Sequence, residues 1–202
     1  MGVNYPVGLN QKNNNMGKVI SLINTTPDGF VDSQYVNADA EFHEFVHGLL
    51  AETQTVAFGR NSFELFQQIW PAILEKEDAA ESQVRMAKAL RDKPKYVFSS
   101  GLTSTTWSNS AIVKAIDAAT INQFKQPGEQ GLLTIGSPGL VAELTKQQLV
   151  DDYYFSIQSV IAGNGGVRLF DKLALDTRQP LKFVESKVLK TGVVIIHYQT
   201  VR

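Results

Sequence analysis

The chain has 202 residues, of which 43% are hydrophobic and 19% are charged, and its formal net charge is −1. A chain of this length and composition can bury the core of one domain, which excludes intrinsic disorder for most of it. The balanced charge argues against nucleic acid as a partner, because binding a polyanion selects for a basic face. No apolar run is long enough to cross a bilayer, so no membrane association is expected. The absence of cysteine excludes disulfides, thiolate metal sites and thiol nucleophiles.

Residues 1–15 are predicted to form a flexible tail, because residues 8–15 are polar and end in three asparagines. Residues 16–202 are predicted to form a single domain. The first residues lack the basic region and apolar core of a signal peptide. We therefore expect a cytoplasmic protein.

The first structural pattern in the chain is an apolar strand over residues 19–23, followed by the turn sequence Pro27-Asp28-Gly29. A helix is predicted next, because the apolar residues over 42–50 are spaced three and four apart. Either Asn37 or Asp39 can cap its N-terminus, since both side chains accept hydrogen bonds from free backbone N–H groups.

A second strand is predicted over residues 55–58, and a helix follows it at once. We expect Pro71 to stop this helix, because proline lacks the N–H group that a helix interior needs. A weaker helix over 79–91, a strand over 96–98 and a short strand over 112–113 come next.

Residues 116–125 are predicted to be helical, residues 132–135 to form a buried strand that runs into a helix ending at Leu144, and residues 153–161 to form another strand. The last two strands, over 182–189 and 193–201, flank the turn signal Thr191-Gly192 with no helix between them. Strands that alternate with helices favour a parallel sheet covered on both faces. The sequence thus predicts an α/β fold with a mainly parallel sheet that ends in an antiparallel hairpin.

Three of the predicted strands end in small or polar residues, namely Gly59-Arg60-Asn61-Ser62, Ser99-Ser100-Gly101 and Gly136-Ser137-Pro138-Gly139. Ligands bind beyond the carboxyl ends of the strands in open parallel sheets. Two of these segments also open helices, whose free N–H groups favour an anion such as a pyrophosphate, and Arg60 adds a charge for a terminal phosphate. The alternative is that the glycines only permit tight turns. Three such segments at equivalent strand ends favour a nucleotide site.

Asp28 is a candidate catalytic residue, because it follows the first strand close to the same edge of the sheet. A carboxyl group there could orient or protonate a heterocycle. The alternative is a role in the turn alone, since Pro-Asp-Gly is a favoured turn sequence.

Other polar and aromatic residues carry weaker signals. His43 and His47 lie four apart on a helix, a spacing that can chelate a metal, but no third ligand is apparent. We expect both to be solvated, no metal to be bound, and His197 to be structural. No G-x-S-x-G elbow is present, which argues against hydrolase chemistry. Aromatic residues at helical spacing could line a flat apolar pocket or belong to the core: Phe42, Phe45, Phe63 and Trp70.

Four segments together resemble the family named for the C-terminal reductase domain of the bacterial bifunctional riboflavin deaminase-reductase, which is akin to dihydrofolate reductase. They are Pro27-Asp28-Gly29-Phe30, residues 58–65 with Trp70-Pro71, residues 132–140, and the glycine-rich residues 160–170. The likeness runs from Lys18 to about Val201 and is closest to stand-alone, single-domain members. It implies the dihydrofolate-reductase-like fold, with three layers in the order α/β/α.

The resemblance also implies NADPH as cofactor and hydride transfer to a pteridine- or pyrimidine-type heterocycle, such as the 5-amino-6-(5-phosphoribosylamino)uracil of riboflavin biosynthesis. By position, Gly59, Arg60, Asn61 and Ser62 look like the segment that meets the cofactor's phosphates, and Ser99, Ser100 and Gly101 look like the edge of the adenosine and 2′-phosphate site. Gly136, Ser137, Pro138, Gly139 and Leu140 look like the pyrophosphate loop. Asn24 and Thr25 would lie near the nicotinamide and substrate, and Phe45 would contact the substrate.

A homodimer is expected from the same resemblance. Two alternatives to the reductase remain open. One is a binding module of the same fold that retains nucleotide affinity without turnover, and the other is a phosphate-binding α/β enzyme unrelated to reductases. The three differ in whether they bind and oxidise NADPH.

Overall fold

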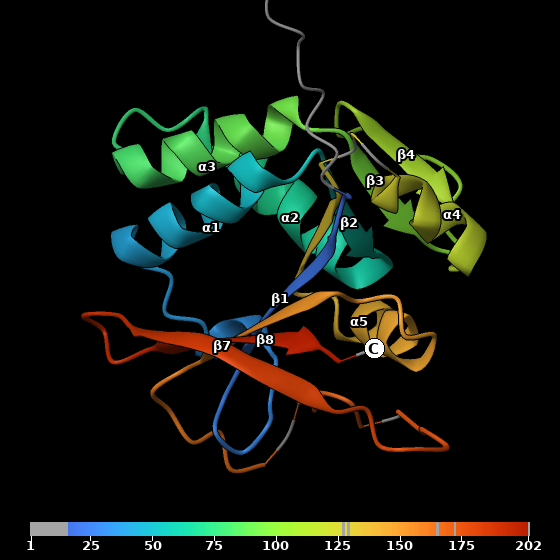
Figure 1. Ribbon diagram of the computed structural model, residues 1–202. Helices are drawn as coiled ribbons and strands as arrows, with labels where there is room; N and C mark the ends of the chain where they lie inside the picture. The colour runs from blue at the N-terminus through green and yellow to red at the C-terminus, as the bar shows by residue number, and fades with distance from the viewer. Residues whose placement is uncertain (1–15, 127, 129, 165, 172, 202) are drawn as a thin grey trace, which may run out of the picture.

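Eight strands form one sheet in the computed structural model, which describes residues 16–126, 128, 130–164, 166–171 and 173–201 (Figure 1). The predicted tail over residues 1–15 lies outside the described residues. The strand order is β4-β3-β2-β5-β1-β6-β8-β7. The bounds are β1 (Val19–Thr25), β2 (Thr55–Gly59), β3 (Lys95–Phe98), β4 (Ser110–Val113), β5 (Leu132–Ile135), β6 (Asp152–Ile157), β7 (Leu181–Val188) and β8 (Val194–Thr200).

The first six strands pair in parallel, whereas β8 pairs antiparallel with both β6 and β7. This confirms the predicted parallel sheet and its antiparallel hairpin. The strand predicted over residues 153–161 is shorter in the structure than expected: β6 ends at Ile157. Beyond it, the backbone N–H groups of Ala162 and Gly163 donate to the carboxylate of Asp28 instead of to a neighbouring strand.

The helices are α1 (Ala40–Glu52), α2 (Arg60–Ile73), α3 (Glu81–Asp92), α4 (Ala118–Asn122) and α5 (Pro138–Lys146), with 3-10 turns at Ser33–Tyr35 and Gln123–Lys125. None of the helices within the described part of the chain is long and apolar enough to span a bilayer. The prediction that Pro71 stops a helix is wrong, since α2 continues to Ile73. Proline has a helical φ angle, and the helix ends two residues later, so the lost N–H donor and the crowding of the preceding carbonyl by the ring affect only its last turn.

The cap of α1 is Asp39, whose Oδ1 accepts a hydrogen bond of 2.8 Å from the N–H group of Phe42. Asn37, the other candidate, instead donates its backbone N–H to Gln158. This bond ties the loop before α1 to the residue that follows β6.

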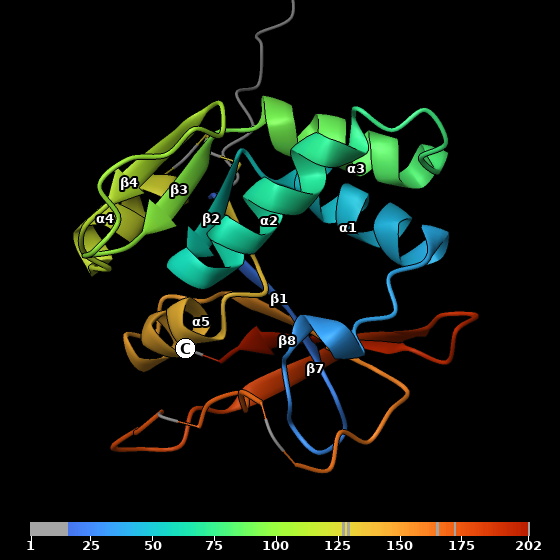
Figure 2. The same cartoon turned by 180° about the vertical axis from the view of Figure 1, so that it is seen from behind.

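Side chains alternate between two cores on the two faces of the sheet. From β1, Ile20 and Leu22 belong to the core beneath α1, α2 and α3, whereas Val19 and Ile23 belong to the core beneath α4 and α5. Figures 1 and 2 show α1, α2 and α3 grouped together on one side of the sheet. The architecture is therefore the expected three layers in the order α/β/α.

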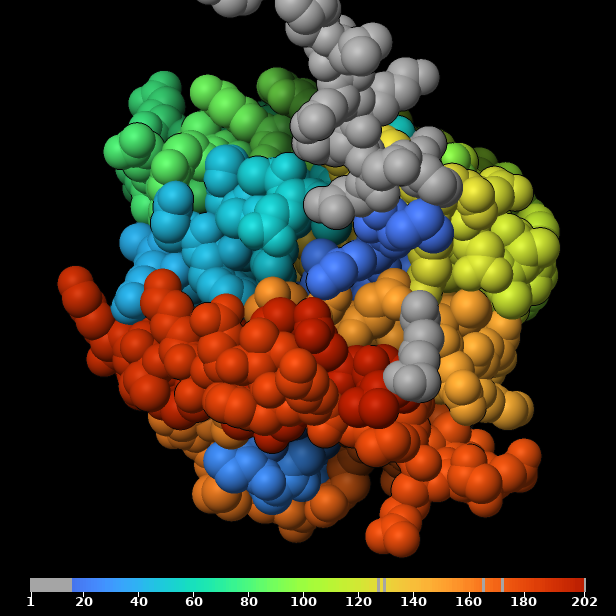
Figure 3. Space-filling view, viewed as in Figure 1, coloured from blue at the N-terminus to red at the C-terminus, as the bar shows by residue number. Residues whose placement is uncertain are grey.

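The outer strand of the C-terminal hairpin carries apolar side chains into solvent. Every residue of β7 is exposed, including Phe183, Val184 and Val188. Figure 3 shows the hairpin, in red, as a broad part of the front surface. The next strand, β8, is partly buried and includes the core residue Ile195.

We predict that Asp39→Ala lowers the free energy of unfolding by about 1 kcal/mol, because the N–H group of Phe42 loses its capping acceptor. Asn37→Ala is the matched control, since the Asn37 side chain does not cap the helix. Chemical denaturation of the two variants measures the difference. Equal losses at both positions would contradict the assignment of the cap.

Candidate functional site

Three loops meet at one edge of the sheet. The strands β3, β2 and β5 are neighbours and run parallel, so their carboxyl ends lie side by side. The loops that follow these strands are the three that the sequence singled out as a nucleotide site.

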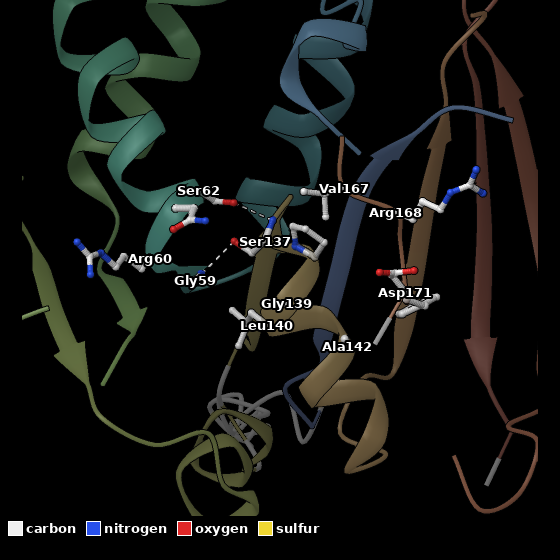
Figure 4. A pocket seen from close by; sticks show the side chains of 13 residues that line it. Gly59, Arg60, Ser62, Ser137, Gly139, Leu140, Ala142, Val167, Arg168 and Asp171 are labelled. Carbon is white, nitrogen blue, oxygen red and sulfur yellow. Dashed lines mark hydrogen bonds between the residues drawn. The ribbon is translucent and has the colours of Figure 1, made fainter. Parts of the chain in front are cut away.

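The loops after β2 and β5 are joined by two reciprocal hydrogen bonds (Figure 4). The N–H group of Gly59 donates to Oγ of Ser137, and the N–H group of Ser137 donates to Oγ of Ser62, each over 3.0 Å. Ser137 has a φ angle of 59°, a left-handed conformation that is unfavourable for a residue with a Cβ atom. The two bonds hold this buried residue in place and fix one loop against the other.

A cleft of about 460 Å³ lies against this junction. Eight of the predicted cofactor residues line it: Gly59, Arg60, Asn61, Ser62, Ser137, Pro138, Gly139 and Leu140. The helices α2 and α5 both begin here, and neither the cap residue Gly59 nor the cap residue Ser137 makes a side-chain capping bond. Their first N–H groups and the positive ends of both helix dipoles can therefore serve an anion in the cleft.

The third predicted loop, after β3, lies beside Arg60. A Cβ atom at Gly101 would be 3.5 Å from the guanidinium Nη1 of Arg60. Arg60 is about half exposed, and its Nε donates to Glu64 over 2.8 Å. Ser99 and Ser100 are not among the described residues that line the cleft, and Oγ of Ser99 accepts a bond from the N–H group of Leu102. Of this loop, Gly101 thus lies beside Arg60.

The opposite wall of the cleft was not assigned from the sequence. It consists of Val167, Arg168, Phe170 and Asp171. The guanidinium of Arg168 lies 4.5 Å from the centre of the Phe30 ring and donates to the backbone carbonyl of Asp28 over 3.2 Å. The sequence feature that marks this wall is the glycine-rich segment over 160–170, for which the sequence alone indicates no role.

Two aspartates hold this wall in position. Asp28 accepts hydrogen bonds from Oγ1 of Thr26, from the N–H group of Ala162 and from that of Gly163, over 2.7, 3.2 and 2.8 Å. Asp32 accepts a bond of 2.9 Å from the N–H group of Val167. Both carboxylates therefore tie the loop after β1 to the segment that forms the far wall of the cleft.

The bonds to Asp28 also stabilise its charged form. The hydrogen bond from Thr26 is the largest influence, and with the two backbone bonds it lowers the pKa of the Asp28 carboxyl to about 2. The carboxylate is ionised at neutral pH and holds no proton to donate. Asp28 does not line the cleft or the neighbouring pocket among their described residues. The geometry supports the turn alternative rather than protonation of a substrate.

A second pocket, which we call the ring pocket, adjoins the cleft and has a volume of about 420 Å³. It lies between the end of β1 and the helices α1, α2 and α3. Four residues line both spaces: Asn61, Ser62, Ser137 and Pro138. A ligand in the cleft and a second molecule in the ring pocket would meet at these residues.

Of the predicted substrate residues, Asn24 lines the ring pocket, and its Oδ1 accepts a bond from the amide of Gln158 over 3.2 Å. Thr25 and Phe45 are not among its described lining residues. Thr25 is buried and donates to the carbonyl of Thr26, and the ring of Phe45 packs 5.6 Å from that of Tyr154. Their neighbours on the same elements, Asn24 and Phe42, face the pocket instead.

His43 also lines the ring pocket, and the expectation that it is solvated is wrong, since only 6% of it is exposed. Its Nδ1 lies 3.3 Å from Oγ of Ser82, and its ring packs edge-to-face against Trp70. Burial lowers the pKa of the His43 imidazole, against a smaller opposing effect of Asp39, so the ring is neutral at pH 7. No cluster of metal-binding side chains occurs among the described residues.

His197 lies away from these spaces, in β8. Its Nε2 is 2.7 Å from Oδ1 of Asp152, whose other oxygen is 3.0 Å from Nζ of Lys18. The imidazole stacks on Tyr154, with ring centres 4.1 Å apart. These contacts support the structural role expected for it.

Known proteins resemble this chain in sequence and in structure. The uncharacterized protein YyaP of Bacillus subtilis (strain 168) is 26% identical over 189 residues, which cover 90% of this chain and 94% of that protein. A putative riboflavin biosynthesis protein from Shewanella sp. PV-4 has a similar structure, with a TM-score of 0.65 and 18% identity over 92% of this chain and 99% of its own.

Two further structures share the fold. The diaminohydroxyphosphoribosylaminopyrimidine deaminase/5-amino-6-(5-phosphoribosylamino)uracil reductase of Thermotoga maritima has a TM-score of 0.61 and 12% identity, over 92% of this chain and 57% of that one. The riboflavin biosynthesis reductase of Saccharomyces cerevisiae has a TM-score of 0.55 and 13% identity, over 96% and 93%.

The sequence itself carries the family assignment. Residues 18–195 match the family described as the RibD C-terminal domain, and this match spans most of the chain. The expectation drawn from the sequence motifs is confirmed. The chain belongs to the RibD C-terminal domain family.

Proposed function

We propose that this protein is an NADPH-dependent reductase that delivers hydride to a pteridine- or pyrimidine-type ring. The observation that supports the proposal is that the cleft and the ring pocket adjoin each other. A cleft with Arg60 and two helix N-termini that lack side-chain caps shares four lining residues with a largely apolar pocket. One space suits a charged dinucleotide and the other a flat ring.

The residues of the cleft fit a phosphorylated cofactor. The N–H groups at the starts of α2 and α5 would hold a pyrophosphate, because both helix dipoles place positive charge there. The guanidinium of Arg60, beside Gly101, would pair with the 2′-phosphate that distinguishes NADPH from NADH. The volume of the cleft lies within the range of about 300–1,000 Å³ that is typical of small-molecule sites.

NADPH supplies the hydride when bound, so the protein needs few catalytic side chains of its own. Asn24 offers its amide to the ring pocket, held in place by Gln158. The apolar side chains of Phe42, Phe66 and Trp70 exclude water from the same space. We assign Asp28 no proton transfer, because it lies outside the described lining of both spaces and its carboxylate is bonded to Thr26, Ala162 and Gly163.

The names of two structural relatives support a substrate class. The Thermotoga maritima protein carries the name of a 5-amino-6-(5-phosphoribosylamino)uracil reductase, and the yeast protein that of a riboflavin biosynthesis reductase. By analogy of fold, an aminopyrimidine ring is our first candidate substrate, and riboflavin biosynthesis is the first pathway to test.

The test is to titrate the protein with NADPH and then to follow nicotinamide absorbance with candidate pteridines and aminopyrimidines. Saturable binding followed by oxidation in the presence of one ring supports the proposal. Binding with no oxidation by any ring would favour the non-catalytic nucleotide module. Absence of nicotinamide binding would overturn both.

We predict that Arg60→Ala weakens NADPH binding about tenfold relative to NADH, a change of about 1.5 kcal/mol. This is the lower end for a charge-assisted bond, because Arg60 is half exposed and already pairs with Glu64. The control is Glu64→Gln, which frees the guanidinium and should leave NADPH affinity unchanged or higher. Equal losses of NADPH and NADH affinity in Arg60→Ala would argue against the 2′-phosphate assignment.

We predict that Asp28→Asn destabilises the fold at neutral pH and that its deficit relative to the unchanged protein shrinks in acid. The pKa of Asp28 is lowered from 3.8 to about 2, so its contribution is complete above pH 4 and is lost as the pH falls towards 2. Urea denaturation of both proteins between pH 2 and pH 7 measures this deficit. If Asp28→Asn kept its stability but lost turnover, Asp28 would instead be assigned a catalytic role.

We further propose that two copies associate through β7. Edge strands present unpaired backbone groups, and an exposed apolar edge favours pairing with another chain. All eight residues of β7 are exposed, and Phe183, Val184 and Val188 are apolar. A second copy of the same strand would cover this edge in an isologous, two-fold contact.

We predict that Phe183→Lys converts a dimer into a monomer, because a buried, unpaired charge at the interface costs several times more than the lost apolar contact. Phe183→Leu keeps the position apolar and should remain dimeric. Light scattering after size exclusion gives both masses. A monomeric unchanged protein, or a dimeric Phe183→Lys variant, would refute association through this strand.

A further inference from the structure

The ring pocket is uncharged. Among the described residues that line it, none is Asp, Glu, Lys or Arg, and its one titratable side chain is His43. Burial lowers the pKa of this imidazole, which keeps it neutral near pH 7. The nearby carboxylates are accounted for, since Asp39 caps α1 and Glu44 pairs with Arg85. The pocket thus offers no fixed charge to a ligand.

This neutrality bears on the kind of substrate that can enter. A phosphate group that leaves water needs arginine or lysine to offset its desolvation. The two arginines of the site line the cleft instead, where Arg60 is the group proposed for the cofactor's 2′-phosphate and Arg168 packs on Phe30 and donates to the Asp28 carbonyl. A phosphorylated substrate would therefore find no arginine or lysine among the described residues that line the ring pocket.

His43 is the polar group best placed to recognise a neutral ring. Its Nδ1 is occupied by Ser82, and Trp70 packs against its ring, so its orientation is fixed by two other helices. The other ring nitrogen, Nε2, has no partner among the described residues and can serve a ligand. Pteridines and pyrimidines have lactam edges with both N–H and C=O groups, so either imidazole tautomer finds a partner.

Building on the reductase function proposed above, we propose that the ring pocket binds an unphosphorylated, uncharged heterocycle and that Nε2 of His43 hydrogen-bonds to its polar edge. The substrate then differs in class from a phosphoribosyl compound. His43 acts as a specificity-determining residue that contacts the ring itself.

The first experiment compares two ligands that differ only in the phosphoribosyl group, 5,6-diaminouracil and 5-amino-6-(5-phosphoribosylamino)uracil. The protein is Trp107→Phe, in which Trp70 is the one remaining tryptophan and reports from the pocket wall. NADP⁺ is bound first and its affinity measured separately, since it permits no turnover. We expect the free base to quench Trp70 and to bind at least about tenfold more tightly than the phosphoribosyl compound.

Tighter binding of the phosphoribosyl compound would overturn the proposal, and so would a lack of quenching by the base and by the bicyclic pteridine lumazine. If NADP⁺ fails to bind, the reductase function falls, and the ring titration repeated without it still decides the chemistry of the pocket. Should Trp107→Phe not fold, the Hε1 resonance of His43 in the unchanged protein provides the same titration.

The second experiment tests His43 directly. We expect His43→Leu to weaken binding of 5,6-diaminouracil about fivefold to tenfold, because one polar edge of the ring loses its partner. His43→Gln keeps a donor and an acceptor and should bind within about threefold of the unchanged protein. His47→Leu, one turn further along α1 and outside the pocket lining, is the matched control with unchanged affinity. Equal affinities in His43→Leu and His47→Leu would show that His43 does not contact the ring.

Discussion

The site depends on the reciprocal hydrogen bonds between the loops after β2 and β5. Ser137 accepts from Gly59 and donates to Ser62, and its left-handed backbone directs both groups towards α2. Because adjacent parallel strands deliver both loops to one edge, these two bonds suffice to bring two helix N-termini to a single cleft. The backbone strain at Ser137 is thus compensated by contacts that also build the site, as is common where function fixes an unusual conformation.

The far wall of the cleft is held by a different device, the carboxylates of Asp28 and Asp32. Both accept backbone N–H groups from the segment after β6, and Gly166, beside Asp32, has a φ angle of 104°, a conformation that favours glycine. A carboxylate with this many donors is stable as an anion and has no proton to give. The carboxylate of Asp28 therefore shapes the far wall of the cleft.

The sequence predicted the strand ends and their convergence, because the period of apolar residues and the rules of parallel sheets determine both. It could not show which residues of α1 face the pocket. His43 precedes Val46 by three and Leu50 by seven, so it borders the apolar stripe, and the packing of α2 and α3 decides that it is buried. Phe45 lies on the other border and packs against Tyr154 of β6, a contact between residues far apart in the chain. Asp28 shows the same limit, since its partners Ala162 and Gly163 come from a distant loop.

The division of charge between the two spaces has a chemical consequence. The cleft offers helix dipoles and arginine to phosphates, whereas the ring pocket offers neutral side chains. A neutral ring that accepts hydride develops negative charge, and in a space without cations this charge is stabilised by hydrogen-bond donors already in place. Asn24, whose amide is held by Gln158, can donate in this way, and so can His43, held by Ser82 and Trp70, in the tautomer that carries its proton on Nε2. Their orientation is set before any ligand arrives, so little reorganisation is needed when the charge appears.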